Sequence, residues 1–375
     1  MCPDPTTEVE TEFAAEVRNR EIGSEFAWSE HSVGQTPPVW MSLGEDRCLV
    51  FSGRTAIEQV LDDAGIKGRA LLPSYCCGSM LQPFRDRGIA VDFYPVCFGD
   101  GLELRCQVPE DCKLLFYCNY FGFRTPFFSR ETLEQIRRNG GIVVEDITHS
   151  ILSENVMHAE SDYAVASLRK WFPVLSGGLS VKTRGRFHRT PGLDPEPEFV
   201  RLRMRAMREK RAYVDADYCG DKQSFLRLYA EANCWLTDHY SDRRIDADSG
   251  ARLRTMDCHS VREQRIRNGN ALYSALQDQN AVRFLFRQEQ MDCPLFVPVI
   301  LDRSVRDRFR DMLVAESVYC PIHWPIPDAS CASNLYGMEL SLVCDQRYGE
   351  EDMQRIAGCL IKCCQAAARG SGGEE

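Results

Sequence analysis

Residues 166–178 read ASLRKWFPVLSGG and set one lysine, Lys170, between a β-like run and a Gly-Gly pair. A hydroxyl, Ser167, lies three residues before that lysine, and Trp171 and Phe172 follow it directly. Most lysines lie in solvated surface loops. A lysine held beside apolar and aromatic side chains can instead act as a nucleophile or a base. Both interpretations are open on this stretch alone.

Lysine is scarce in this chain, which makes Lys170 easier to single out. The sequence has 45 Lys and Arg, and only seven of them are lysines, at positions 67, 113, 170, 182, 210, 222 and 362. Arginine keeps its proton under all ordinary conditions. Amine chemistry in this protein is therefore limited to very few side chains.

The chain around this stretch alternates between β-like and helix-like segments. Strands are expected at 48–51, 70–75, 90–96, 113–122, 163–168 and 177–183 and at the start of 141–150, and helices at 52–65, 77–87 and 129–141. Apolar strands that alternate with helices predict an α/β fold with a mostly parallel sheet, covered on both faces.

The division of the chain follows from changes in this pattern. We expect an N-terminal segment (1–47), a large ligand-binding domain (48–245), a small α+β C-terminal domain (250–368) and a flexible tail (369–375). The small domain is expected to contain helices at 257–278, 304–316 and 350–368 and strands at 294–301, 318–325 and 339–344. Residues 190–245 are rich in Arg, Tyr, Glu and Asp and predict helices with a long connection.

Three further motifs fall where expected strands end, which is where parallel α/β sheets bind ligands. SGRT (52–55) follows a strand and begins a helix, so it suits either a phosphate or a simple helix cap by Ser52. EDITHS (145–150) ends an apolar strand with two carboxylates that point to opposite faces, so one can face a ligand while the other anchors a loop. YCNYFG (117–122) brings Asn119 to another strand end, where a plain turn is an equal alternative.

The order of these motifs is more informative than any one of them. A phosphate-type loop, then an aspartate at a strand end, then Ser-x-x-Lys at the next strand meets the needs of pyridoxal 5′-phosphate (PLP). Its phosphate suits a helix N-terminus, its ring nitrogen suits a carboxylate, and its aldehyde suits a lysine amine.

The chain resembles the DegT/DnrJ/StrS family of PLP-dependent aminotransferases, which have the aspartate-aminotransferase fold. The segments that carry the resemblance are SGRTAI (52–57), LLPSYCC (71–77), YCNYFGF (117–123), VEDITHS (144–150), SLRKWFPVLSGG (167–178), YCPIHWPIP (319–327) and LSLVCDQRYGEEDM (340–353). The resemblance implies a PLP-dependent transferase fold, with the mostly parallel sheet in the large domain and a smaller α+β C-terminal domain.

The resemblance also implies roles for individual residues. Lys170 corresponds to the lysine that forms the Schiff base, Asp146 to the partner of the pyridinium nitrogen, and His149 to a residue near the ring oxygen. The remaining implied cofactor contacts are the phosphate-binding hydroxyl of Ser167, the backbone N–H groups of Gly53, Arg54 and Thr55, the ring-face residues Tyr75, Cys76 and Cys77, and Asn119.

The implied function is transfer of an amino group from an amino acid, in this family usually glutamate, to a keto acceptor that can be a nucleotide-linked keto sugar. Such reactions serve sugar and polysaccharide biosynthesis. The resemblance further implies a homodimer with the active site at the interface. The family's segment that reaches the phosphate of the neighbouring subunit has no match near 216–235. Arg347, His323 and Trp324 are further candidates for substrate contact, or else structural residues of the C-terminal domain.

Two other hypotheses stay open from the sequence. One is a PLP-dependent dehydratase or lyase, although the dehydratases with this scaffold typically have histidine where this chain has Lys170. The other is a non-catalytic PLP-binding regulator on the same scaffold.

Composition limits the remaining possibilities. The net charge of −10 argues against binding to nucleic acid or to acidic membranes. The N-terminal residues MCPDPTTEVETEFAAEV show no basic or apolar signal region, so we expect a cytoplasmic protein. The 18 cysteines include no C-x-x-C pair, which favours reduced cysteines packed as small apolar residues and no bound metal.

Overall fold

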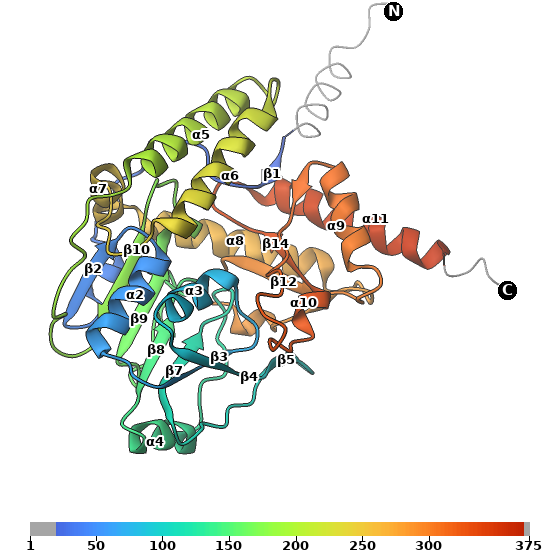
Figure 1. Cartoon of the computed structure of the whole chain (residues 1–375). Coiled ribbons are helices and arrows are strands. Elements are labelled where there is room, and N and C mark those ends of the chain that lie inside the picture. The colour runs from blue at the N-terminus through green and yellow to red at the C-terminus, as the bar shows by residue number, and fades with distance from the viewer. Residues whose placement is uncertain (1–19, 371–375) are drawn as a thin grey trace, which may run out of the picture.

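The computed structural model describes residues 20–370, and a seven-stranded sheet forms its centre (Figure 1). Across the sheet the order is β2 (Asp46–Val50), β10 (Gly178–Lys182), β9 (Tyr163–Ser167), β8 (Ile142–Asp146), β7 (Cys112–Cys118), β3 (Arg69–Pro73) and β4 (Ala90–Tyr94). Strand β10 pairs antiparallel with both β2 and β9, and all the other neighbouring strands pair in parallel. The expectation of a mostly parallel sheet is therefore confirmed.

Both faces of this sheet are covered. The consecutive residues Leu114, Leu115 and Phe116 of β7 are all completely buried, although their side chains point alternately to the two faces. The helices that connect these strands are α2 (Gly53–Ala64), α3 (Gly78–Asp86) and α4 (Arg130–Arg138). Continuous apolar strands are what a sheet covered on two sides requires.

Helix α2 begins and ends where the sequence indicates. The Ser52 hydroxyl accepts a hydrogen bond from the Thr55 N–H at 3.2 Å, which caps the first turn. Gly65 follows the last turn with a φ of 57°, a left-handed conformation that glycine adopts without strain. The start of α2 is thereby fixed directly after β2.

A helical hairpin stands over the carboxyl end of the sheet (Figure 1). It consists of α5 (Pro197–Asp215) and α6 (Lys222–Asp238), and α7 (Ala247–Thr255) follows it. Phe199 of α5 packs edge-on against Phe51, the residue after β2, with ring centroids 4.9 Å apart. The hairpin thus covers the loops that follow β2 and β9.

The C-terminal part of the chain forms a smaller antiparallel sheet with helices. Its strands are β11 (Arg283–Phe284), β12 (Phe296–Ile300) and β14 (Glu339–Val343), and its long helices are α8 (Cys258–Leu276), α9 (Arg306–Ala315) and α11 (Glu350–Gly370). Two short antiparallel strands, β5 (Val96–Phe98) and β6 (Leu102–Leu104), and the short helix α10 (Leu335–Met338) complete this side (Figure 1).

The start of the described part of the chain pairs with a strand of the C-terminal part. Strand β1 (Ile22–Gly23) pairs in parallel with β13 (Val318–Tyr319), so the blue β1 lies beside the orange C-terminal part of the chain in Figure 1. A Cβ atom on Gly23 would lie 2.4 Å from the Tyr319 carbonyl oxygen, so this pairing requires glycine. The sequence did not indicate the contact.

Two sequence expectations about the C-terminal part are wrong in detail. The strand expected over 318–325 is only two residues long, because Pro321 and Pro325 have no N–H to donate to a ladder. Helix α11 continues to Gly370, two residues beyond its expected end, and the remaining residues of the expected tail, 371–375, lie outside the described range.

The cysteines described in the structure are all free of disulfides. Within residues 20–370 no three His, Cys, Asp or Glu side chains are placed to hold a metal ion. Among the same residues, none of the helices combines the length and the apolar character needed to cross a bilayer.

Candidate active site

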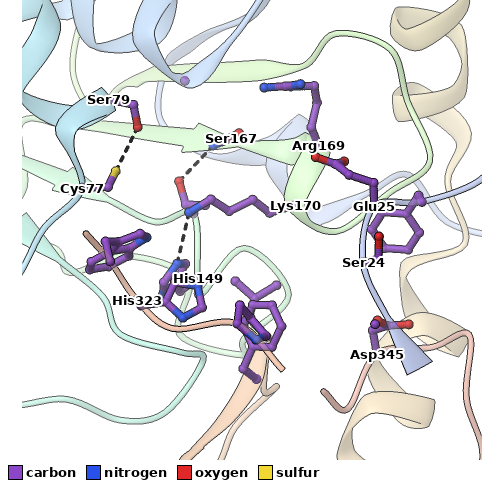
Figure 2. Close-up of a pocket in the computed structure, with 18 of the residues that line it drawn as sticks. Ser24, Glu25, Cys77, Ser79, His149, Ser167, Arg169, Lys170, His323 and Asp345 are labelled. Carbon is purple, nitrogen blue, oxygen red and sulfur yellow. Dashed lines mark hydrogen bonds between the residues drawn. The ribbon is translucent and has the colours of Figure 1, made fainter. Parts of the chain in front are cut away.

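A cavity of about 680 Å³ opens at the carboxyl ends of β8 and β9, beside the start of α2 (Figure 2). This volume lies in the range of small-molecule sites. Seven residues that the sequence singled out line it: Gly53, Arg54, Cys77, Asp146, His149, Ser167 and Lys170. Motifs up to about 120 residues apart in the chain therefore meet in one place.

Four other residues expected to contact the cofactor do not line the cavity: Thr55, Asn119, Tyr75 and Cys76. Thr55 donates its hydroxyl hydrogen to the Tyr240 carbonyl oxygen at 2.7 Å, and its N–H is already bound to Ser52. Asn119 is buried and donates to Glu145 at 2.6 Å.

Tyr75 and Cys76 lie behind the cavity wall. The Tyr75 ring is completely buried, and its centroid lies 5.0 Å from that of Trp324 and 5.2 Å from that of Tyr336. The Cys76 N–H donates to the Tyr336 hydroxyl at 3.0 Å. Of the three residues expected at the ring face, only Cys77 reaches the cavity.

Lys170 ends a short 3-10 turn, η2 (Leu168–Lys170), directly after β9. The turn is held by Trp171, whose indole N–H donates to the Thr148 carbonyl oxygen at 2.6 Å and whose own carbonyl accepts from Gln346 at 2.7 Å. The guanidinium of Arg265 lies 4.4 Å from the Trp171 ring. Lys170 itself is exposed to the cavity. The aromatic neighbour thus fixes the backbone and leaves the amine free to reach a ligand.

The amine of Lys170 points toward His149, with 3.4 Å between Nζ and Nε2 (Figure 2). The other ring nitrogen, Nδ1, accepts a hydrogen bond from the Phe121 N–H at 3.0 Å. A neutral imidazole whose Nδ1 accepts must carry its hydrogen on Nε2. His149 therefore presents an N–H donor toward the cavity, where a ligand beside Lys170 can accept it.

Burial lowers the pKa of His149 well below its ordinary value, and the positive charge of Lys170 acts in the same direction. The unfolded chain binds a proton at this residue below about pH 6.5, whereas the folded chain does not. The free energy of unfolding is therefore expected to fall as pH decreases through that value, by up to about 1.4 kcal/mol per pH unit from this group.

His149→Gln is expected to remove this contribution. The difference between the wild-type and variant free energies of unfolding, measured by urea denaturation without cofactor, should shift by about 1–2 kcal/mol between pH 7 and pH 5. His259→Gln, which removes an exposed ring on α8, controls for the loss of a histidine. If the wild-type and variant free energies of unfolding differ by the same amount at pH 7 and pH 5, the ring of His149 is not held neutral in the folded chain.

The two carboxylates at the end of β8 point to opposite sides, as the alternation predicted. Asp146 lines the cavity, and its Oδ1 accepts from the Thr148 N–H at 2.8 Å. Glu145 is completely buried on the other face and anchors the following loop by accepting from the His158 N–H at 2.8 Å and the Ser161 hydroxyl at 2.6 Å. One strand end thus supplies both a ligand group and a loop anchor.

Asp146 is the carboxylate available to a bound ligand. Burial raises its pKa above the ordinary value, although the hydrogen bond from Thr148 and the charge of Lys170 oppose that shift. A cationic group placed against Asp146 would stabilise the ionised form. The aspartate is therefore suited to a protonated ring nitrogen.

The opposite end of the cavity is suited to an anion. Gly53 and Arg54 begin α2, where the first N–H groups of a helix have no partner within it. A Cβ on Gly53 would lie 3.2 Å from the Ser167 Cβ, so the start of α2 is packed closely against the end of β9. The Nε atoms of Arg54 and Arg169 are buried there without a hydrogen-bond partner.

Several lining residues were not foreseen from the sequence as part of the site. The N-terminal segment contributes Ser24 and Glu25, and the turn η2 contributes Arg169 beside Lys170 (Figure 2). Nothing in the sequence indicated the first two, because β1 reaches the site only through its pairing with β13. Arg169 could have been noticed as the basic neighbour of Lys170.

The three C-terminal candidates for substrate contact also line the cavity, but two of them have partners. Arg347 makes a two-atom ion pair with Asp345, with distances of 2.9 and 2.7 Å. His323 Nδ1 lies 2.9 Å from the Ser341 hydroxyl. The Trp324 ring centroid lies 5.8 Å from Lys170 Nζ. Arg347 is therefore already neutralised within the chain.

These observations fit PLP. The cavity offers a lysine amine, a buried carboxylate and an anion-binding end with two unpaired guanidinium groups. They correspond to the aldehyde, the ring nitrogen and the phosphate of that cofactor.

No protein-family model matches this chain, and no curated protein is similar to it in sequence. Solved structures are similar in fold. DesI, studied with its TDP-sugar product, has a TM-score of 0.60 at 16% identity, covering 88% of this chain and 84% of DesI. The putative sugar aminotransferase Spr1654 from Streptococcus pneumoniae, in its PLP form, has a TM-score of 0.60 at 11% identity, covering 97% of each chain.

A DegT DnrJ EryC1 StrS aminotransferase from Brucella abortus is also similar, with a TM-score of 0.54 at 16% identity, covering 85% of this chain and 86% of that chain. These structures share their overall architecture with most of this chain. The expected fold class, the PLP-dependent transferase fold of the aspartate-aminotransferase type, is confirmed.

Proposed function

We propose that this protein is a PLP-dependent aminotransferase of the DegT/DnrJ/StrS type in which Lys170 carries the cofactor. The observation that supports this most strongly is the meeting of Lys170, Asp146 and the start of α2 in one cavity. Each of the three suits a different part of PLP, and the solved structures with the same fold include aminotransferases.

In this proposal each residue has a separate task. Asp146 holds a positive charge on the ring nitrogen, and the N–H of His149 Nε2 orients the groups beside Lys170. When bound, PLP supplies an electron sink for bonds at the carbon that bears the substrate amino group. The Lys170 amine, set on a rigid turn, would remove the proton from that carbon of the amino donor in the first half-reaction. It would deliver a proton to the corresponding carbon of the acceptor in the second.

The proposed donor is an amino acid, with glutamate the first choice, and the proposed acceptor is a nucleotide-linked keto sugar. The acceptor is supported by DesI, which has the same fold and whose crystal structure was analysed in the presence of its TDP-sugar product. Beyond the lysine, the cavity continues between α6 and α9, where Lys222, Leu226 and Arg310 line it. Lys222 is paired with Glu21 at 2.6 Å, so Arg310 and Leu226 supply the cationic and apolar surface for a second substrate.

The proposal includes a homodimer and a cytoplasmic location. The homodimer comes from the family resemblance, and the location is a prediction made from the sequence. Sedimentation velocity of the PLP-loaded protein would test the first of these.

The half-reaction with an amino donor tests the proposed function. We expect PLP-loaded protein mixed with L-glutamate to release 2-oxoglutarate in an amount stoichiometric with bound cofactor, measured by mass spectrometry. A panel of other amino acids, tested in parallel, identifies the preferred donor. If PLP is bound but no amino acid yields its keto acid, the protein is a dehydratase, a lyase or a regulator.

A further inference from the structure

Two arginines that line the cavity each have a buried Nε atom without a hydrogen-bond partner. Within residues 20–370, six buried side-chain nitrogen or oxygen atoms lack a hydrogen-bond partner, and the Nε atoms of Arg54 and Arg169 are two of them. Native proteins pair nearly all such groups, so unpaired ones call for an explanation. Both belong to residues that line the same cavity.

The two guanidinium groups come from separate segments that are packed together. Arg54 is the second residue of α2, and Arg169 lies between Ser167 and Lys170. The close approach of Gly53 to Ser167 brings these segments into contact. The Cζ of Arg169 lies 5.6 Å from the centre of the Phe199 ring.

This end of the cavity carries an excess of positive charge. Burial lowers the pKa of Arg169 to about 9, and the charges of Arg203 and Arg54 act in the same direction, whereas Glu25 opposes them. Glu25 is itself shared, because its carboxylate lies 3.3 Å from a guanidinium nitrogen of the buried Arg203. Arg54 and Arg169 are therefore left without a full counter-ion.

We propose that the guanidinium groups of Arg54 and Arg169 together bind the phosphate of PLP, in the same chain that supplies Lys170. The inference rests on the proposed function. It gives the phosphate two positively charged partners in addition to the backbone N–H groups at the start of α2. A phosphate monoester carries a charge of about −1.5 to −2 at pH 7, which two guanidinium groups balance. The planar fork of arginine also matches phosphate geometry.

This assignment explains a departure noted in the sequence. The segment by which the neighbouring subunit would reach the phosphate has no match near 216–235. Residues 222–238 form α6, which packs on α5 in the helical hairpin. Two arginines from the same chain would make the phosphate end complete within one subunit.

The test compares PLP with pyridoxal, which has the same ring and aldehyde but no phosphate. Cofactor-free protein is titrated with each compound, and the phosphate preference is the ratio of the pyridoxal Kd to the PLP Kd. We expect Arg54→Gln and Arg169→Gln each to lower this ratio by about 10- to 100-fold while the pyridoxal Kd changes by less than about threefold. Arg105→Gln, which alters a side chain that is 74% exposed, is the control.

Thermal unfolding provides a second readout that does not depend on activity. Removing an unpaired buried charge should leave the cofactor-free protein as stable as wild type or more stable. Inorganic phosphate at millimolar concentration should raise the Tm of wild type and not that of the Arg54→Gln, Arg169→Gln double variant. A purely structural role would give the reverse, a lower Tm without ligand and an unchanged response to phosphate.

Glu25→Gln should act in the opposite direction on phosphate binding. It removes the carboxylate whose charge acts on Arg169, so the phosphate preference should rise.

A preference within about threefold of wild type in both arginine variants would overturn the inference if PLP still attaches to Lys170. Absence of attachment in wild type would instead overturn the proposed function.

Discussion

Lys170→Ala is expected to abolish amino transfer, with the rate of keto-acid formation from bound donor lowered by about 10³-fold or more. The reason is that Lys170 is the amine placed in the cavity between His149 and the end of β9, and it has the task of moving the proton. Single-turnover measurement with L-glutamate tests this. Lys67→Ala, which removes an exposed lysine beyond α2, should leave the rate unchanged.

Chemical rescue separates a lost amine from a damaged fold. Truncation at Lys170 leaves space in a cavity that is open to solvent, so a small primary amine can enter it. We expect methylamine to restore part of the activity of Lys170→Ala and to have no such effect on wild type. A variant that keeps its wild-type rate, or that is not rescued although it is folded and binds PLP, would contradict the role of Lys170.

Asp146→Asn is expected to slow the half-reaction by about 10²- to 10³-fold without harming the fold. Asparagine keeps an oxygen that can accept from the Thr148 N–H but removes the charge that holds a proton on the ring nitrogen. Because burial raises the pKa of Asp146, its ionised form is disfavoured in the cofactor-free protein. The cofactor-free variant should therefore unfold at the same temperature as wild type or higher at pH 7.

Glu145→Gln is the matched control for Asp146→Asn, since the two carboxylates are adjacent but point to opposite faces. It weakens the hydrogen bonds from His158 and Ser161, so the Tm should fall. The rate of the half-reaction should stay within about threefold of wild type. The opposite pattern, a stable but inactive Glu145→Gln and an active Asp146→Asn, would contradict the assignment of the two residues.

Much of the framework could be predicted because it depends on local pattern. Continuous apolar runs predicted the strands of the parallel sheet, and Ser52 and Gly65 predicted both ends of α2. Strand alternation predicted that Glu145 and Asp146 point to opposite faces, and the family resemblance indicated which of the two belongs to the site. The motifs that follow such strands could then be expected to meet, because parallel strands end at one edge of the sheet.

The residues that sequence patterns did not place depend on long-range contacts. Glu25 reaches the cavity because β1 pairs with β13, far away in the chain, and it contacts Arg203, 178 residues later. Tyr75 was expected at the ring face but lies behind the wall, packed against Trp324 and Tyr336. Periodicity carries no information about either contact.

Arg169 shows a different limit. It is next to Lys170 in the sequence, but the residues after Ser167 form a 3-10 turn, so strand alternation no longer tells where a side chain points. Only the structure shows that its side chain lines the same cavity as the start of α2.

Mapping the lysine that holds PLP tests the central claim most directly. PLP-loaded protein is reduced with sodium borohydride and digested, and the modified peptide is identified by mass spectrometry. We expect one stable modification, on Lys170 within SLRKWF (167–172), which is absent in Lys170→Ala and unchanged in Lys67→Ala. Modification of another lysine that lines the cavity, such as Lys222, or no modification at all, would contradict it.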